Sequence, residues 1–179
     1  INVWGAQVEA GTFLTSYIPT TTAAVTRAAD VASINTLSPW FNATGVLFTF
    51  RQIVIGQQVI ANYGVFQFDD TTSSNQIRSG GASTLQVVNG GVTQANIAGV
   101  PNITFDGTLF KFASAWKVNN FATVTVGSVA TDTSGVVPTV SVFRLGSTES
   151  LSAQLSGYLQ RITYYPKCLT NAELQALTV

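Results

Sequence analysis

The 179-residue chain contains no histidine, no methionine and one cysteine, Cys168. Without histidine, Ser-His-Asp and Cys-His mechanisms are excluded. A single thiol can form neither a zinc site nor an intrachain disulfide. We expect Cys168 to be a small buried apolar side chain between a strand and a helix. Because no initiator methionine is present, we also expect the chain to be a piece of a longer protein.

Charge is also scarce. Charged residues make up 9% of the chain, against a usual share of about 25%, and the net charge is zero. The sequence therefore lacks the basic patch expected of a protein that binds nucleic acid or an anionic membrane. No apolar run approaches the roughly 18 residues of a membrane span, and no basic segment marks a signal peptide. Weak charge lowers the desolvation cost of a subunit interface, so we expect a homo-oligomer.

What the sequence does contain is a series of short segments rich in β-branched and aromatic residues. Turn signals such as Gly90-Gly91 and Asn119-Asn120 separate neighbouring segments, which is typical of β-hairpins. About a dozen short strands are expected, among them 1–8, 45–51, 59–63, 84–89, 92–97, 101–105, 109–117 and 121–126. The prediction is an all-β protein, an antiparallel β-sandwich of the jelly-roll kind, with residues 31–179 as its domain. Residues 1–30 are predicted to be a strand and extended linker from a preceding domain.

The last 25 residues give the clearest local signals. Residues 155–164 alternate as a strand, and Pro166 ends it because proline cannot donate a ladder hydrogen bond. Thr170 and Glu173 have the spacing of a capping box, and Leu174 and Leu177 supply one apolar stripe. A short C-terminal helix is therefore predicted.

Two terminal stretches resemble a known family. GYLQRITYYP at 157–166 and LTNAELQALT at 169–178 resemble the end of laminin-G/concanavalin A-like C-terminal domains of bacteriophage tail fibres and tail spikes, or their prophage homologues. WGAQVEAG at 4–11, TSYIPT at 15–20 and VTRAAD at 25–30 are similar to the segment that leads into such domains. The resemblance implies a non-catalytic receptor-binding module, trimeric and extracellular on the virion tail, that binds host cell-surface polysaccharide. Its alternative is a structural trimerisation or capping domain without ligand recognition.

A polysaccharide hydrolase or lyase is the less favoured reading. Retaining glycosidases need two carboxyl groups about 5–5.5 Å apart, and no Glu-x-Asp-x-Glu pattern is present. The adjacent acids Asp69 and Asp70 are consecutive in a predicted turn and would point in different directions. Gln76-Ile77-Arg78 has the outline of a lyase segment but lacks the histidine. We therefore expect no enzymatic activity.

Two groups of residues are candidates for glycan binding, because aromatic faces stack on sugar rings while amides bond the hydroxyls. The first group is Trp116, Lys117, Asn119 and Asn120, near a hairpin tip, and the second is Trp40 and Asn42. The alternative is that both tryptophans belong to the core, as aromatic residues in sandwich strands usually do. An exposed aromatic patch would favour recognition, whereas buried aromatics would favour assembly.

A calcium site is the one cofactor prediction. Asp69, Asp70 and Asn75 supply hard oxygen ligands within one loop. The same residue types are also preferred in any turn, so a purely structural turn is the alternative.

Overall fold

The computed structural model describes residues 5–8, 17–20, 22–26, 30–43, 46–54, 64–80, 84–99, 109–151, 154–155 and 157–179. The chain divides into two compact units, Ile1–Asp30 and Val31–Val179. In the first unit, residues 5–8 belong to no strand, so the strand predicted over 1–8 is wrong for that stretch. Among the described residues, no helix is long and apolar enough to cross a membrane.

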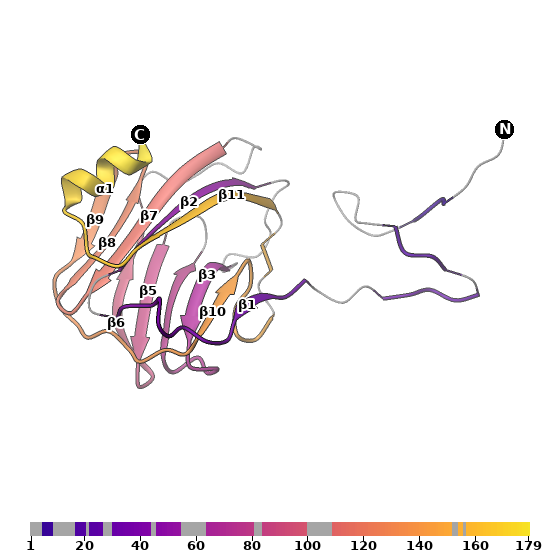
Figure 1. The fold of residues 1–179 in the computed structure, drawn as a ribbon, viewed down its shortest axis with the longest axis horizontal. Coiled ribbons are helices and arrows are strands. Elements are labelled where there is room, and N and C mark those ends of the chain that lie inside the picture. Colours follow the sequence, from indigo (N-terminus) through magenta and orange to yellow (C-terminus); the bar gives the residue numbers. More distant parts are fainter. Residues whose placement is uncertain are drawn as a thin grey trace. The chain divides into compact units, whose positions relative to one another are not determined.

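The second unit is built from two antiparallel sheets (Figure 1). Sheet A has the strand order β1-β10-β3-β4-β5-β6, and sheet B has the order β11-β2-β7-β8-β9. The strands of sheet A are β1 (Ala32–Ile34), β3 (Gly64–Asp69), β4 (Gln76–Gly80), β5 (Thr84–Asn89), β6 (Val92–Ile97) and β10 (Val142–Leu145). Those of sheet B are β2 (Val46–Val54), β7 (Leu109–Lys117), β8 (Asn120–Thr125), β9 (Ser128–Asp132) and β11 (Gly157–Tyr165).

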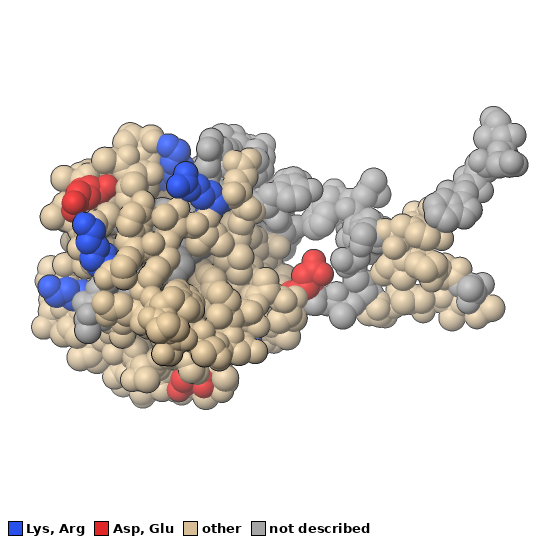
Figure 2. Space-filling model, in the orientation of Figure 1, with Lys and Arg blue, Asp and Glu red and all other residues tan. Residues whose placement is uncertain are grey.

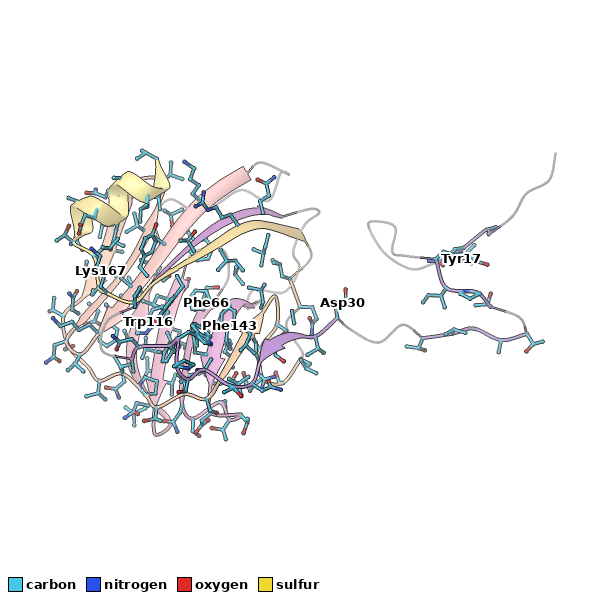
Figure 3. All side chains as sticks on the ribbon, in the orientation of Figure 1. Tyr17, Asp30, Phe66, Trp116, Phe143 and Lys167 are labelled. Carbon is cyan, nitrogen blue, oxygen red and sulfur yellow. The ribbon has the colours of Figure 1, made fainter. Side chains whose placement is uncertain are left out.

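Large aromatic side chains fill the space between the two sheets (Figure 3). Phe66 and Phe68 of β3 have no exposed surface, and neither has Trp116 of β7. The Phe66 and Trp116 rings stack with their centroids 5.9 Å apart, so the core joins sheet A to sheet B directly. Burying one such side chain contributes roughly 1.5–3 kcal/mol, which gives a chain without disulfides its stability.

The helix α1 (Asn171–Thr178) packs on the outer face of sheet B. Its capping box is present, with Thr170 as the N-cap residue and Glu173 reaching back to it. Leu174 is fully buried against small side chains of β7 and β8, namely Ala113, Ala115, Ala122 and Val124. Small residues at these positions let the helix approach the sheet closely. No described residue forms a helix over the outer face of sheet A.

The predicted fold class is confirmed: the protein is an antiparallel β-sandwich with one short C-terminal helix. The segment 45–51, predicted as a central strand, is β2 and lies between β11 and β7. The Gly90-Gly91 hairpin connects β5 to β6, with φ angles of 58° and 78°. The strands predicted at 59–63 and 101–105 lie outside the described residues.

Candidate functional site

Trp116 does not lie where a sugar-stacking residue must lie. Its indole is 0% exposed and contacts Phe66 and Phe68, whose ring centroids are 5.9 and 5.7 Å away. A side chain with no exposed surface offers no face to a ligand, so the structure corrects the prediction for this residue. Alternation along β7 is the physical reason, because Trp116 shares its inward face with Phe112.

The polar residues after Trp116 organise a turn, and their role in glycan binding stays a prediction. The backbone N–H of Asn119 donates to the Gly135 carbonyl (2.9 Å), and its Oδ1 accepts from the Gly135 N–H (3.1 Å). Asn119 itself adopts a φ of 57°, a conformation that asparagine tolerates better than most residues. Asn120 donates to the Cys168 sulfur (3.9 Å), and Lys117 is exposed. Burial raises the pKa of the Cys168 thiol, and the Lys117 charge offsets part of that rise.

Trp40 and Asn42 lie at an edge of the core. Trp40 is half-buried and packs edge-on against Tyr164, with ring centroids 5.3 Å apart. The Asn42 backbone N–H donates to the Tyr164 hydroxyl (2.8 Å), and the Asn42 side chain stays exposed. Both residues thus tie residues 36–42 to β11, and their role in glycan binding stays a prediction.

The three predicted calcium ligands are already engaged by protein donors. Asp69 is fully buried and accepts from Arg144, with Nε to Oδ2 at 2.7 Å and Nη2 to Oδ1 at 3.3 Å. The Asp69 Oδ1 also accepts from the Thr71 N–H (2.8 Å). A calcium ion would have to displace these bonds from Asp69.

Asp70 and Asn75 form the frame of the following turn. Asp70 accepts from Thr72 and from the Asn75 amide (2.8 Å), and these bonds hold the pKa of Asp70 below its usual range. Asn75 Oδ1 accepts from the Gly90 N–H (2.9 Å), which links this turn to the β5–β6 hairpin. The described residues contain no cluster of three or more acidic or thiol groups suited to a metal. Calcium binding therefore stays an untested prediction.

A row of polar side chains crosses the outer face of sheet A. The strand register places Arg144 opposite Gln67, Gln67 opposite Arg78, Arg78 opposite Gln86, and Gln86 opposite Asn96. Their sequence neighbours Phe66, Ile77, Leu85 and Ala95 are core residues, so alternation turns the row outward. We call these five residues, on β10, β3, β4, β5 and β6, the polar row.

A strap of residues 146–151 covers the β3 part of the polar row. The Gly146 N–H donates to the Val65 carbonyl (2.9 Å), and a Cβ at Gly64 would lie 3.2 Å from the Ser147 carbonyl oxygen. Glu149 then reaches back to Gln67, whose Nε2 donates to Glu149 Oε2 at 2.5 Å. Gln67 is buried as a result, and the β10 and β3 end of the row is occupied by protein contacts.

The other end of the polar row, on β4, β5 and β6, has groups to offer a ligand. Arg78 is half-buried, and its Nε donates to Gln86 Oε1 (2.7 Å). Within the described part of the chain, the Arg78 Nη atoms have no hydrogen-bond partner and Arg78 has no carboxylate within salt-bridge distance. Asn96 is exposed, and its amide has no partner among the same residues. Sequence reasoning missed this surface, although Gln76-Ile77-Arg78 drew attention as an incomplete lyase motif.

Charged side chains are few on the face shown in Figure 2; several lie close together at the α1 end, and most of the remaining described face is neutral. Among the Trp, Phe and Tyr side chains of residues 31–179 whose exposure the structure describes, none is exposed; Phe48, Phe50, Phe110 and Tyr158 lie outside that set. The exposed large apolar side chains there are aliphatic: Val31, Ile34, Val92, Val118, Val126, Val136, Leu151 and Val179. The side chains whose exposure is described therefore offer hydrogen bonds from polar groups and form no exposed aromatic patch.

No protein-family model matches the chain, and no curated protein sequence matches it. Solved structures do resemble it. Domain 4 of AbnA, a GH43 extracellular arabinanase from Geobacillus stearothermophilus solved with arabinotriose, has a TM-score of 0.65 and 11% identity over 85% of this chain and 82% of that one. The CBM40 of Ruminococcus gnavus IT-sialidase, bound to α2,3-sialyllactose, has a TM-score of 0.61 and 14% identity over 77% and 84%.

Mouse laminin α1 domains LG4-5 also resemble the chain, with a TM-score of 0.58 and 9% identity over 79% of this chain and 40% of that one. At identities this low the likeness establishes the fold alone. The predicted laminin-G-like β-sandwich is thereby confirmed.

Proposed function

We propose that this chain is a glycan-binding domain and that its binding surface is the β4–β6 end of the polar row. The observation that carries the proposal is that the Arg78 Nη atoms and the Asn96 amide, which lie on the same face, have no hydrogen-bond partner among the described residues. Gln86 lies between these two residues in the strand register. Guanidinium and amide groups in fixed positions are suited to the closely spaced hydroxyls of a sugar. Strand pairing supports the rigid spacing that such recognition needs.

Similar domains support this proposal. The AbnA domain was solved with arabinotriose and the CBM40 domain with sialyllactose, so this fold holds oligosaccharides in at least two other proteins. Neither sugar is assigned to the present chain on that ground. Because the groups that this end of sheet A offers are the Arg78 guanidinium and the Asn96 amide, we propose recognition by hydrogen bonds in place of ring stacking.

The setting of the domain is a separate part of the proposal. The terminal segments that resemble phage tail fibres support a place at the C-terminal end of a fibre or spike, outside the cell, with host surface polysaccharide as the ligand. A non-catalytic role is proposed with it, because the sequence contains no histidine and no alternating Glu-x-Asp-x-Glu carboxylates.

The test is binding of the whole chain to an array of oligosaccharides, followed by calorimetry on the best probe. Asn96→Ala removes one exposed amide and is expected to weaken binding about 2–10-fold, the value of one or two hydrogen bonds. Gln160→Ala on β11, an exposed amide of sheet B, is the matched control and should leave affinity unchanged. Equal losses for the two variants, or no binding to any probe, would refute the proposed surface.

Assembly is the second candidate function, and specific observations favour it. The sandwich aromatics whose exposure is described are buried or half-buried, and exposed valines occur at Val92, Val118 and Val136. The bond from the Asn119 N–H to the Gly135 carbonyl brings the neighbouring residues Val118 and Val136 close together. The Val136 N–H also donates to Gln94 Oε1 on β6, the strand that carries Val92. In this second candidate function, the domain forms a trimer interface and recognises no ligand. The mass of the protein in solution tests it.

A further inference from the structure

We propose that Arg78 is an anion-binding position and that the polar row selects acidic saccharides, those bearing a carboxylate or a sulfate. The proposal rests on the proposed function and names the ligand class for that same surface. Three arginines of the described domain, Arg78, Arg144 and Arg161, differ in burial and in hydrogen-bond partner.

Arg144 and Arg161 each have a settled environment. Arg144 lies on the same face as Arg78, and its charge is balanced by Asp69 at 2.7 Å. Arg161 on β11 is exposed, lies opposite Arg51 of β2 in the strand register and donates from Nε to Thr163 Oγ1 (3.2 Å), so water solvates its charge. Arg144 thus has a counter-ion, whereas the charge of Arg161 is exposed to solvent.

Arg78 has neither form of compensation. It is half-buried, which reduces its solvation, and no carboxylate of the described residues lies within salt-bridge distance. Its neighbours across the strands, Gln67 and Gln86, are neutral. Asp69 is paired with Arg144, and Glu149 accepts from the neutral Gln67 amide and, like the other described acids, forms no ion pair with Arg78. A partly buried charge without a counter-ion is unfavourable, and an anionic ligand would relieve it.

The guanidinium of Arg78 is also oriented for this role. Gln86 Oε1 accepts from Nε at 2.7 Å and fixes the plane of the group. The remaining four N–H donors belong to the two Nη atoms, and a planar fork of this kind matches the two oxygens of a carboxylate or sulfate. Gln86 is thus a positioning residue, and Arg78 is the group that touches the anion.

The experiment uses the whole chain and matched pairs of probes that differ in one acidic group. The pairs are α2,3-sialyllactose with lactose, 3′-sulfolactose with lactose, and trigalacturonate with its methyl ester. We expect the acidic member of at least one pair to bind about tenfold or more tightly than its partner, as charge-assisted bonds do. The sialyl, galacturonate and sulfo arms distinguish carboxylate from sulfate. Acidic binding should also weaken as sodium chloride rises.

Arg78→Gln should reduce the acidic preference to less than about threefold while binding of any neutral probe changes little. Arg161→Gln, the same change on sheet B, is the control and should keep the preference. Arg78→Lys keeps the charge but loses the fork, so it should lose at least about threefold in affinity for the acidic probe. If Arg78→Gln does not fold, the affinity of Arg78→Lys for the acidic probe tests whether Arg78 binds the anion.

Three outcomes overturn the inference. Equal binding of acidic and neutral members would remove the selectivity while leaving the proposed glycan function standing. A preference that survives both Arg78 variants would place the anion elsewhere. No binding to any probe would refute the inference together with the proposed function.

Discussion

At the scale of single residues, Asp69 holds together the outer face of β3. Its carboxylate is fully buried and accepts bonds from Arg144, Thr71 and Gln67. These contacts join β3, β10 and the turn that follows β3. The charge of Asp69 is therefore part of the architecture and is not available as a general binding group.

Removing that charge should destabilise the domain. Asp69→Asn leaves the largely buried Arg144 without its counter-ion, and breaking such a pair costs on the order of 3–5 kcal/mol. Asp132→Asn, at the end of β9, where the carboxylate accepts from Ser134 alone among the described residues, is the control and should cost less than about 1 kcal/mol. Urea unfolding monitored by fluorescence measures both, and equal midpoints would contradict the role given to Asp69.

The same saturation of Asp69 and Asp70 leads to a prediction about calcium. Since protein donors occupy both carboxylates, we expect the melting temperature in excess EGTA to equal that in millimolar calcium. Magnesium serves as the control cation. A calcium-specific rise of several degrees would contradict this expectation and support the predicted metal site.

Trp116 should matter for folding and not for ligand affinity. Trp116→Ala removes a fully buried indole and is expected to cost about 3–5 kcal/mol, whereas exposed Val118→Ala should cost under about 0.5 kcal/mol. Trp116→Phe leaves a smaller cavity in the core than Trp116→Ala does, so glycan affinity can be measured on a folded variant. If the Trp116→Phe protein were stable but no longer bound glycan, the conclusion that Trp116 does not contribute to ligand affinity would be wrong.

At the scale of elements, α1 depends on its N-terminal cap. The Thr170 backbone N–H and hydroxyl both donate to Glu173 Oε2 (2.8 Å each), and these bonds hold the pKa of Glu173 below its usual range. The helix is short and has one buried leucine, Leu174, so the cap contributes a large share of its local stability.

The lowered pKa of Glu173 gives a pH dependence of known sign. The pKa of Glu173 is lower in the folded state than in the unfolded state. The ionised Glu173 side chain therefore stabilises the fold at pH values above the ordinary glutamate pKa of about 4.3. This stabilisation is lost as the pH falls through the lower folded-state pKa. Glu173→Gln should therefore be less stable than the parent near neutral pH, with the difference shrinking in acid. Thermal melts at several pH values measure this. A difference that grows in acid would contradict the assignment.

At the scale of the whole molecule, a neutral surface with few charges suits association. The solution mass of the chain, from light scattering during size exclusion, tests the assembly candidate. Three chain masses are expected if these residues contain the trimer interface, and Val118→Glu should then shift the mass toward one chain, because a charge in an apolar contact is costly to desolvate. A single chain mass for the parent would place trimerisation outside these residues and leave the glycan-binding domain as the better account.

The sequence by itself determined the elements whose signals are local. The Gly90-Gly91 hairpin, the central position of β2 and the capping box of α1 depend on residues within a few positions of one another, and all three are present in the structure. The all-β class followed from the same short-range patterns. The two strands predicted at 59–63 and 101–105 stay predictions.

Only the tertiary structure decided which residues share a surface. Whether Trp116 faced the core or a ligand depended on the face of β7 that meets Phe66, a residue 50 positions earlier. The polar row joins Arg78, Gln86 and Asn96 with Arg144 through strand register, which no local pattern encodes. Register is set by the packing of whole sheets, so sequence alone could predict the sandwich but not the face on which it presents its polar groups.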